Sequence, residues 1–227
     1  MNTSSASGIL SQAAAEPFHF NSSASLIQIE RDRAGNLGEL LSALRSCPEE
    51  SIFQHTIQTL QEHHYIREGF SNDFAHWAYT DCNEAGLAER LSNVDVRTFT
   101  SLESLREQIV KTVQDYLKAN PAVAERPALK PFYFLSSESV VVPTPFIAHN
   151  LREFIDELGK VSIHSIHHHF IEARLRLKMV SNDFSMWLEK QLGLNKVAAN
   201  LNRIDIYTAT LEDVRAQLVR ILQTARA

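Results

Sequence analysis

Short stretches of alternating aromatic and β-branched residues occur twice along the chain. One set comprises Phe18–Phe20 and Leu26–Ile29, and the other comprises Phe132–Leu135 and Val140–Val142. In each set a Ser-rich run separates the two apolar stretches. Period-2 alternation around such a run predicts a small β-ribbon at both places.

Helical patterns follow each predicted ribbon. Asn36-x-x-Glu39 and Asn150-x-x-Glu153 have the spacing of a capping box, in which Asn caps the helix and Glu reaches back to a free backbone amide. Over residues 163–177, apolar residues recur at steps of three and four, which predicts a helix with one apolar stripe.

Further capping signals predict the later helices. Asn72 and Asn182 each precede a short stretch with Phe and Trp three residues apart on one helical face. Thr100 and Thr210 each stand three residues before an acidic residue and are predicted to cap the last helix of each half. These signals amount to four to five helices in each half, so the protein is predicted to be mainly α.

The two halves of the sequence align with each other. Residues 17–55 match residues 131–169 without a gap at an offset of 114, with 14 identities in 39 positions. After a four-residue deletion in the second half, Ser71–Phe74 meets Ser181–Phe184. The same order of uncommon residues predicts an internal duplication.

The predicted fold follows from this repeat. It consists of two tandem helical repeats related by a pseudo-twofold axis, each preceded by a short β-ribbon. Residues 1–16 are expected to be a flexible tail, 17–117 the first copy and 131–224 the second copy. Residues 118–130, which are rich in Pro and Ala, are expected to be a linker.

Composition excludes several classes of partner. The chain is 44% apolar, carries a net charge of −5 and has no cluster of Lys and Arg, so nucleic acid is not expected to bind. No apolar run approaches the roughly 20 residues of a membrane helix, and no membrane association is expected. Cys47 and Cys82 have no paired spacing, and the N-terminus lacks the features of a signal peptide. A cytoplasmic location is therefore expected.

Several motifs together resemble a known family. They are S-I-F-Q-H, E-H-H-Y and S-N-D-F-A-H-W in the first half, and S-I-H-H-H-F-I-E-A-R-L-R-L and N-D-F-S-M-W-L in the second. The chain resembles, from about Pro17 onward, an uncharacterised prokaryotic family catalogued only as a domain of unknown function, with two tandem related halves. The resemblance implies no activity, cofactor or catalytic residue.

Histidines form the first candidate site. Ten are present, and only His55 and His169 occupy equivalent positions in the two halves. Glu172 lies three residues after His169, on the same face of a regular helix. His55, His169 and Glu172, with Asp73 or Asp183, are candidate ligands of a divalent metal. The alternative is that the two equivalent histidines are half-buried and hydrogen-bonded to a neighbouring turn, while His63, His64, His167 and His168 are partly solvated.

The repeated Asn-Asp-Phe-x-x-Trp motif forms the second candidate site. Asp73 and Asp183 could bind a metal or a sugar hydroxyl, and Trp77 and Trp187 could stack on a ligand. The alternative is structural: Asn caps a helix, Asp favours its positive end, and Phe and Trp enter the core.

The sequence also lacks most catalytic signatures. It has only seven glycines, without a phosphate-binding loop or dinucleotide fingerprint, and no Gly-x-Ser-x-Gly elbow. We therefore expect a soluble module that binds a protein partner, a second copy of itself or a small ligand between its halves. The alternative is a metal-dependent enzyme or metal-binding protein with His, Glu and Asp near the pseudo-twofold axis, so the sequence leaves open whether the protein is an enzyme.

Overall fold

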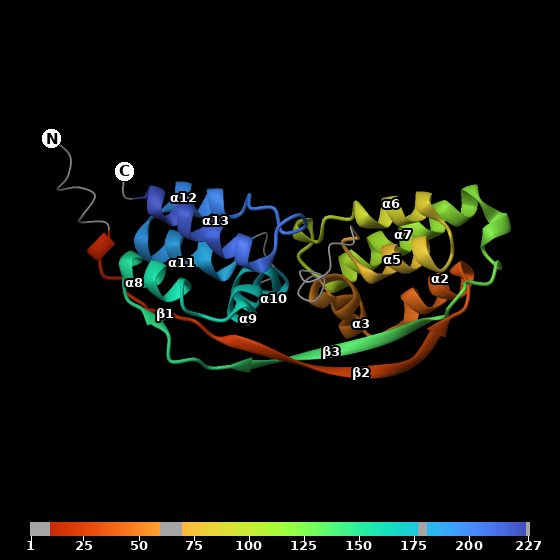
Figure 1. The fold of residues 1–227 in the computed structure, drawn as a ribbon, viewed down its shortest axis with the longest axis horizontal. Coiled ribbons are helices and arrows are strands. Elements are labelled where there is room, and N and C mark those ends of the chain that lie inside the picture. Colours follow the sequence, from red (N-terminus) through yellow and green to blue (C-terminus); the bar gives the residue numbers. More distant parts are fainter. Residues whose placement is uncertain (1–9, 60–69, 177–180, 226–227) are drawn as a thin grey trace. The chain divides into compact units, whose positions relative to one another are not determined.

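A computed structural model of the chain describes residues 10–59, 70–176 and 181–225 (Figure 1). Helices make up most of these residues, which confirms the prediction of a mainly α protein. The β part consists of two small antiparallel sheets of two strands each, β1 with β4 and β2 with β3. No described helix is long and apolar enough to cross a membrane.

Packing divides the chain into two compact units. Unit 1 comprises Met1–Ala24 and Val140–Ala227, and unit 2 comprises Ser25–Ser139. Residues 10–24 therefore pack with helices from the other end of the sequence. The boundaries predicted for the two copies come from the alignment of the two halves of the sequence and not from packing, so they stay a prediction.

Unit 2 is built around the long helix α7. This helix packs against α2, α3 and α6, while α5 packs against α6 and η1. Its elements are β2 (Ser22–Ala34), α2 (Leu37–Ser46), α3 (Glu49–Phe53), η1 (Gln54–Gln58), α5 (Asp73–Thr80), α6 (Ala85–Ser92), η2 (Val96–Thr98), α7 (Leu102–Ala119), η3 (Pro121–Val123) and β3 (Phe132–Val142). The first residues of β2 and the last residues of β3 belong to unit 1.

Unit 1 is built in a similar way around α13. This helix packs against α8, α9 and α12, while α11 packs against α12 and η4. Its elements are β1 (Phe18–His19), β4 (Ile147–Ala148), α8 (Leu151–Leu158), α9 (Ile163–Ile166), η4 (His167–Glu172), α10 (Ala173–Arg176), α11 (Asp183–Leu192), α12 (Asn195–Leu201) and α13 (Leu211–Thr224).

The predicted Asn caps are confirmed. The side chains of Asn36, Asn150, Asn72 and Asn182 each accept a hydrogen bond from the backbone N–H three residues on. In the two boxes with Glu, the carboxylate reaches one residue further back than predicted, because Glu39 accepts from the N–H of Gly35 and Glu153 accepts from the N–H of His149. Local sequence thus determines where these four helices begin.

The two predicted Thr caps have different outcomes. Thr210 forms a complete capping box with Asp213. The prediction for Thr100 is wrong by one residue, because Ser101 is the cap and accepts from the N–H of Ser104. Both residues carry a hydroxyl. In the sequence, Glu103 favoured Thr100 as the cap because it stands three residues after it. In the structure, it is Ser101 that has the extended backbone of an N-cap.

Strand pairing differs from the predicted ribbons. Each ribbon was expected to fold back on itself, whereas Phe18 pairs with Ala148, His19 pairs with Ile147, and β2 pairs with β3. Neither Ser-rich run is a turn, because residues 22–25 begin β2 and residues 136–139 lie within β3. The runs contain no Gly or Asn that would provide the positive φ of a tight hairpin, so the chain continues extended.

Both units contain a π-helical turn that the periodicity did not predict. The turns are η1, which follows α3, and η4, which follows α9. A π turn closes between residues five apart, so it rotates the side chains that follow relative to a regular helix. The predicted single stripe over 163–177 is therefore interrupted, and residue 177 lies outside the described residues.

Candidate functional site

His55 in unit 2 uses both ring nitrogens inside the protein. Nδ1 lies 2.8 Å from Oδ2 of Asp73, and Nε2 accepts a 2.8 Å hydrogen bond from the backbone N–H of Leu135. Thr59 donates its hydroxyl to the other oxygen of Asp73 at 2.8 Å. The side chain of His55 is 3% exposed. The ring therefore ties the start of β3 to α5.

His169 in unit 1 has the same arrangement. Its Nδ1 lies 2.7 Å from Oδ2 of Asp183, and its Nε2 accepts a 2.8 Å hydrogen bond from the backbone N–H of Asn21. Its side chain is 5% exposed. In both units an N–H donor faces Nε2, so the proton of the neutral ring lies on Nδ1 and is directed at the carboxylate.

The two tryptophans are also hydrogen-bonded within their units. The indole N–H of Trp77 donates to the carbonyl oxygen of Lys130, and that of Trp187 donates to the carbonyl oxygen of Glu16, both at 2.8 Å. The residues are 4% and 7% exposed. Their indoles thus hold the residue that precedes Pro131 or Pro17, instead of presenting an open stacking surface.

Each segment held in this way inserts two phenylalanine rings. Phe132 and Phe134 lie beside His55 and Phe74 in unit 2. Phe18 and Phe20 lie beside an aromatic cluster of unit 1 that consists of Phe154, His169, Phe184 and Trp187. All four inserted rings are at most 7% exposed.

Glu172 is the centre of a buried polar cluster in unit 1. It lies 3.0 Å from Nδ1 of His167 and 3.2 Å from Nδ1 of His168, and it accepts the hydroxyl of Ser23 at 3.2 Å. Burial raises the pKa of Glu172, but the hydrogen bonds and positive charge of His167 and His168 outweigh burial and lower it well below its usual range.

The cluster corrects two expectations from the sequence. His167 and His168 were expected to be partly solvated, whereas they are 0% and 3% exposed. Glu172 was expected to lie beside His169, because the two are three residues apart on a regular helix. Its hydrogen bonds instead include those to His168 and His167, four and five residues back, because the helix has π geometry there. The signal in the sequence was a run of three histidines between the apolar residues Ile166 and Phe170. His63 and His64 lie outside the described residues.

The proposed metal ligands can now be located. His55 pairs with Asp73 in unit 2, while His169 pairs with Asp183 and Glu172 binds other histidines in unit 1. Within residues 10–59, 70–176 and 181–225, no group of three His, Cys, Asp or Glu side chains is arranged to hold a metal ion. Metal and ligand binding by these residues stay predictions.

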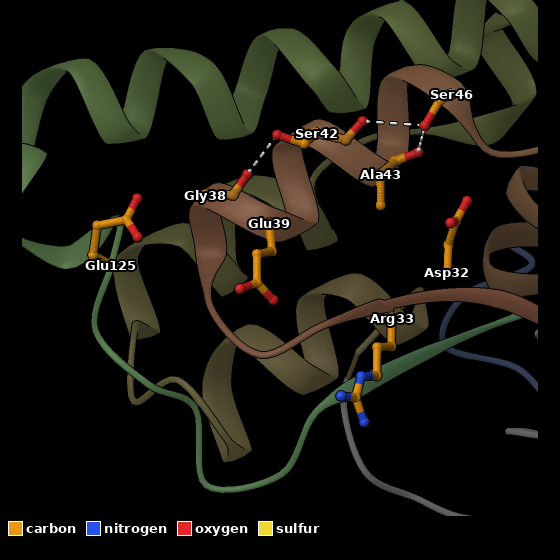
Figure 2. A pocket seen from close by; sticks show the side chains of 8 residues that line it. All are labelled: Asp32, Arg33, Gly38, Glu39, Ser42, Ala43, Ser46 and Glu125. Atoms are coloured by element: carbon orange, nitrogen blue, oxygen red, sulfur yellow. Dashed lines mark hydrogen bonds between the residues drawn. The ribbon is translucent and has the colours of Figure 1, made fainter.

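Two cavities lie elsewhere in unit 2. One, of about 460 Å³, lies beside α2, and Figure 2 shows the acidic side chains of Asp32, Glu39 and Glu125 around it. The second, of about 430 Å³, is lined by Leu26, Gln28, Glu30, Pro48, Glu50, Ser136, Ser137 and Glu138. Neither cavity is lined by a predicted site residue. Carboxylates line both cavities, and Arg33 also lines the first one.

A second buried carboxylate in unit 2 was not anticipated. Glu84 accepts hydrogen bonds from the hydroxyl of Tyr116 and from Arg126, which also donates to the carbonyl oxygen of Cys82. Burial raises the pKa of Tyr116, and the hydrogen bond to Glu84 raises it further. These contacts fix the segment after α7 to the helix bundle.

Comparison with known proteins gives a family without a function. The chain matches the model described as "Family of unknown function (DUF5752)" over residues 15–223. A solved structure, that of OrfY from the archaeon Thermoproteus tenax, is 29% identical with a TM-score of 0.85 and covers 95% of this chain and 98% of that chain. No curated protein matches the chain. Because the family match spans nearly the whole sequence, the chain belongs to the DUF5752 family of unknown function.

Proposed function

We propose that this protein is a non-enzymatic module that binds a protein partner through the outer face of β2, formed by Ile27, Ile29, Arg31 and Arg33. The observation that carries this proposal is the exposure of two isoleucines on one strand. Ile27 is 50% exposed and Ile29 is 78% exposed. Contiguous exposed apolar side chains are typical of interaction surfaces.

The alternation of β2 places these four side chains together. Successive residues of a strand point to opposite faces, so every second residue shares a face. Figure 2 shows the side chain of Asp32 on the side of the strand next to α2 and that of Arg33 on the other side. Leu26, Gln28 and Glu30 line a cavity together with Glu50 of α3, so Ile27, Ile29 and Arg31 point to the opposite face, while Arg33 also lines the cavity beside α2.

The edge of β2 suits the addition of another strand. In the described sheet β2 has one strand neighbour, β3, so its other edge carries no strand. An extended partner segment can add to such an edge through backbone hydrogen bonds, with alternate side chains giving specificity. Full burial of an exposed isoleucine contributes about 1.5–3 kcal/mol, and because Ile27 is 50% and Ile29 78% exposed, only the corresponding part of this would be gained.

The charged side chains of β2 indicate which residues the partner segment carries. Arg31 and Arg33 are exposed and add two positive side chains to this face of a chain with a net charge of −5. We therefore expect an extended segment that has apolar residues opposite Ile27 and Ile29, followed by acidic residues opposite the arginines.

Affinity capture with matched variants tests this function. The test variant is Ile27→Ser with Ile29→Ser, and the control is Leu129→Ser, which alters a side chain that is 82% exposed and lies outside β2. We expect one protein to be captured in stoichiometric amount by the wild type and the control and to be lost with the test variant. With that protein purified, calorimetry should show at least a hundredfold weaker binding to the test variant.

Two further results decide the proposal. Arg31→Glu with Arg33→Glu should weaken binding and reduce its dependence on salt, because the attraction is electrostatic. Both β2 variants should stay folded, with a loss of about 1 kcal/mol for each Ile→Ser change at most, because Ile27 is half buried and both isoleucines lie in a strand. Unchanged capture by the Ile27→Ser, Ile29→Ser variant, or no stoichiometric partner at all, would overturn the proposal.

We also infer that the two units are copies produced by duplication. In support, each unit holds a Pro-Phe-x-Phe segment through one histidine, one aspartate and one tryptophan with matching hydrogen bonds. The residues involved are those that the alignment of the two halves makes equivalent.

A further inference from the structure

The cavity of about 430 Å³ in unit 2 lies where β2, β3 and the first turn of α3 meet. Its lining contains three glutamates, one from each of these elements: Glu30 of β2, Glu50 of α3 and Glu138 of β3. Among the described residues that line it, there is no Lys, Arg or His. Small-molecule sites have volumes of about 300–1,000 Å³. Three carboxylates thus line one cavity of a size that suits a small ligand.

A buried hydroxyl in the same lining lacks a partner. Ser137 lines the cavity but is only 3% exposed. Its Oγ has no hydrogen-bond partner within the described part of the chain, whereas the neighbouring Ser136 donates its hydroxyl to Glu30. A buried polar atom without a partner costs free energy, and a ligand that forms a hydrogen bond with Ser137 removes this cost. The hydroxyl of Ser137 therefore points to a ligand independently of the charge of the glutamates.

The aligned positions of unit 1 have neither feature. At the offset of 114, Ser137 aligns with Ser23, whose hydroxyl donates to Glu172. The residues that align with the three glutamates are not acidic, and they are Thr144, His164 and Ala24. The acidic lining and the serine without a partner thus occur together in unit 2, which is the pattern expected of groups that serve one ligand.

The chemistry of the lining indicates the class of ligand. Carboxylates only accept hydrogen bonds, so they select a ligand with N–H donors and positive charge. No group of three His, Cys, Asp or Glu side chains in residues 10–59, 70–176 and 181–225 is arranged to hold a metal ion. Carboxylates from three separate elements instead suit ammonium groups spaced along a chain. Leu26 and Pro48 also line the cavity and offer apolar surface to the methylene groups between them.

We propose that the cavity between β2, β3 and α3 binds an aliphatic polyamine, whose ammonium groups contact the three glutamates and one of which donates a hydrogen bond to Ser137. Glu30 alternates with Ile29 along β2, so the cavity and the outer face of the strand lie on opposite sides. The proposal therefore does not depend on the docking role of β2.

Calorimetric titration of the full-length protein at low salt tests this site. The probes are butylamine, putrescine and spermidine, which carry one, two and three ammonium groups on methylene chains. We expect the affinity to rise in that order, because each further ammonium group gains another carboxylate, and to fall when salt is added. Equal affinity for butylamine and spermidine, or displacement of spermidine by an equal concentration of magnesium chloride, would overturn the proposal.

Matched variants locate the site. Glu50→Gln with Glu138→Gln removes two exposed carboxylates from the lining, and Glu49→Gln with Glu107→Gln removes two exposed carboxylates of unit 2 that do not line the cavity. The first variant should bind spermidine about tenfold more weakly than the wild type, because it loses two ion pairs. The second should stay within about twofold of the wild type, since distant exposed charges are screened. Equal weakening in both variants would show non-specific attraction and overturn the proposal.

The hydroxyl of Ser137 has a separate test. Ser137→Ala should weaken spermidine binding about tenfold, which corresponds to one hydrogen bond to a charged group. Its free energy of unfolding without spermidine should not fall, because the hydroxyl has no protein partner to lose among the described residues. Unchanged spermidine binding by Ser137→Ala would contradict its place in the site.

One further variant separates this proposal from the docking of a partner on β2. Ile27→Ser with Ile29→Ser alters the opposite face of the strand and should bind spermidine as the wild type does. Loss of spermidine binding by this folded variant would overturn the position of the site, whereas loss of partner capture alone leaves the site as proposed.

Discussion

The backbone N–H of Leu135 donates to Nε2 of His55 across 80 residues of sequence, at 2.8 Å. Since Nδ1 of the same ring faces Asp73, one histidine joins a strand to a helix that is remote in sequence. Asn21 and His169 repeat this relationship in unit 1. The two histidines that the sequence offered as metal ligands are therefore each engaged in a structural connection.

Removal of His55 should destabilise the protein. The change His55→Ala leaves the N–H of Leu135 and the carboxylate of Asp73 without this partner in a buried site, so we expect a loss of about 2–4 kcal/mol in the free energy of unfolding, measured in urea. His149→Ala is the control, because its side chain is 61% exposed and should change the same quantity by less than about 0.5 kcal/mol. Equal effects of the two changes would contradict the structural role of His55.

The tautomer of both histidines can be observed directly. Because a backbone N–H points at each Nε2, nitrogen NMR at mildly alkaline pH should show Nδ1 protonated and Nε2 unprotonated in His55 and His169. The same two rings in the urea-unfolded protein, where these hydrogen bonds are absent, serve as the comparison. Protonation at Nε2 in either buried ring would rule out the described hydrogen bonds.

The position of the cap of α7 can be tested with two neighbouring substitutions. Ser101→Ala removes the hydroxyl that accepts from Ser104, so it should cost about 0.5–2 kcal/mol of stability. Thr100→Ala should have an effect of less than about 0.5 kcal/mol, because Thr100 is exposed and does not cap the helix. Urea unfolding of the two variants checks the order, and the reverse order would favour Thr100 as the cap.

Glu172 should make the stability depend on pH in the acid range. Its folded-state pKa lies below its ordinary value of 4.5, so the unfolded chain binds more protons as the pH falls through that value. The stability contributed by ionised Glu172 is therefore complete above about pH 5 and is lost progressively as the pH falls towards the folded-state pKa.

Urea unfolding between pH 7 and pH 3 checks this dependence. Glu172→Gln should be less stable than the wild type at pH 7, and the difference should narrow below about pH 5. Glu212→Gln, which alters an exposed glutamate, should follow the wild type. A difference between wild type and Glu172→Gln that stays constant over this range would show that the charge of Glu172 does not contribute.

Both cysteines should be unreactive in the folded protein. Burial raises the pKa of Cys47 to about 11 and that of Cys82 to about 12, so little reactive thiolate is present near pH 8. A coloured thiol reagent should label neither residue in the native protein and both in denaturant. Rapid labelling of a native thiol would show that its surroundings open in solution.

The sequence by itself determined the local features. The caps at Asn36, Asn72, Asn150 and Asn182, the capping box at Thr210 and the helical content all depend on groups a few residues apart, and the structure confirms them. The burial of Phe and Trp in the repeated motif also agrees with its structural alternative. Such short-range interactions depend little on the rest of the chain, so a pattern in the sequence is enough to identify them.

Only the tertiary structure decided the long-range partners. The sequence contains two Pro-Phe-x-Phe segments and two clusters with His, Asp, Phe and Trp, and the local chemistry of either segment suits either cluster. The path of the chain selects the pairing, and it places Phe18 in unit 1 and Phe132 in unit 2. The π turns also became visible only in the structure, because a bulge of one residue within a helix leaves no periodic signal. The polar contacts of Glu172 follow from that bulge, so regular helical spacing could not predict them.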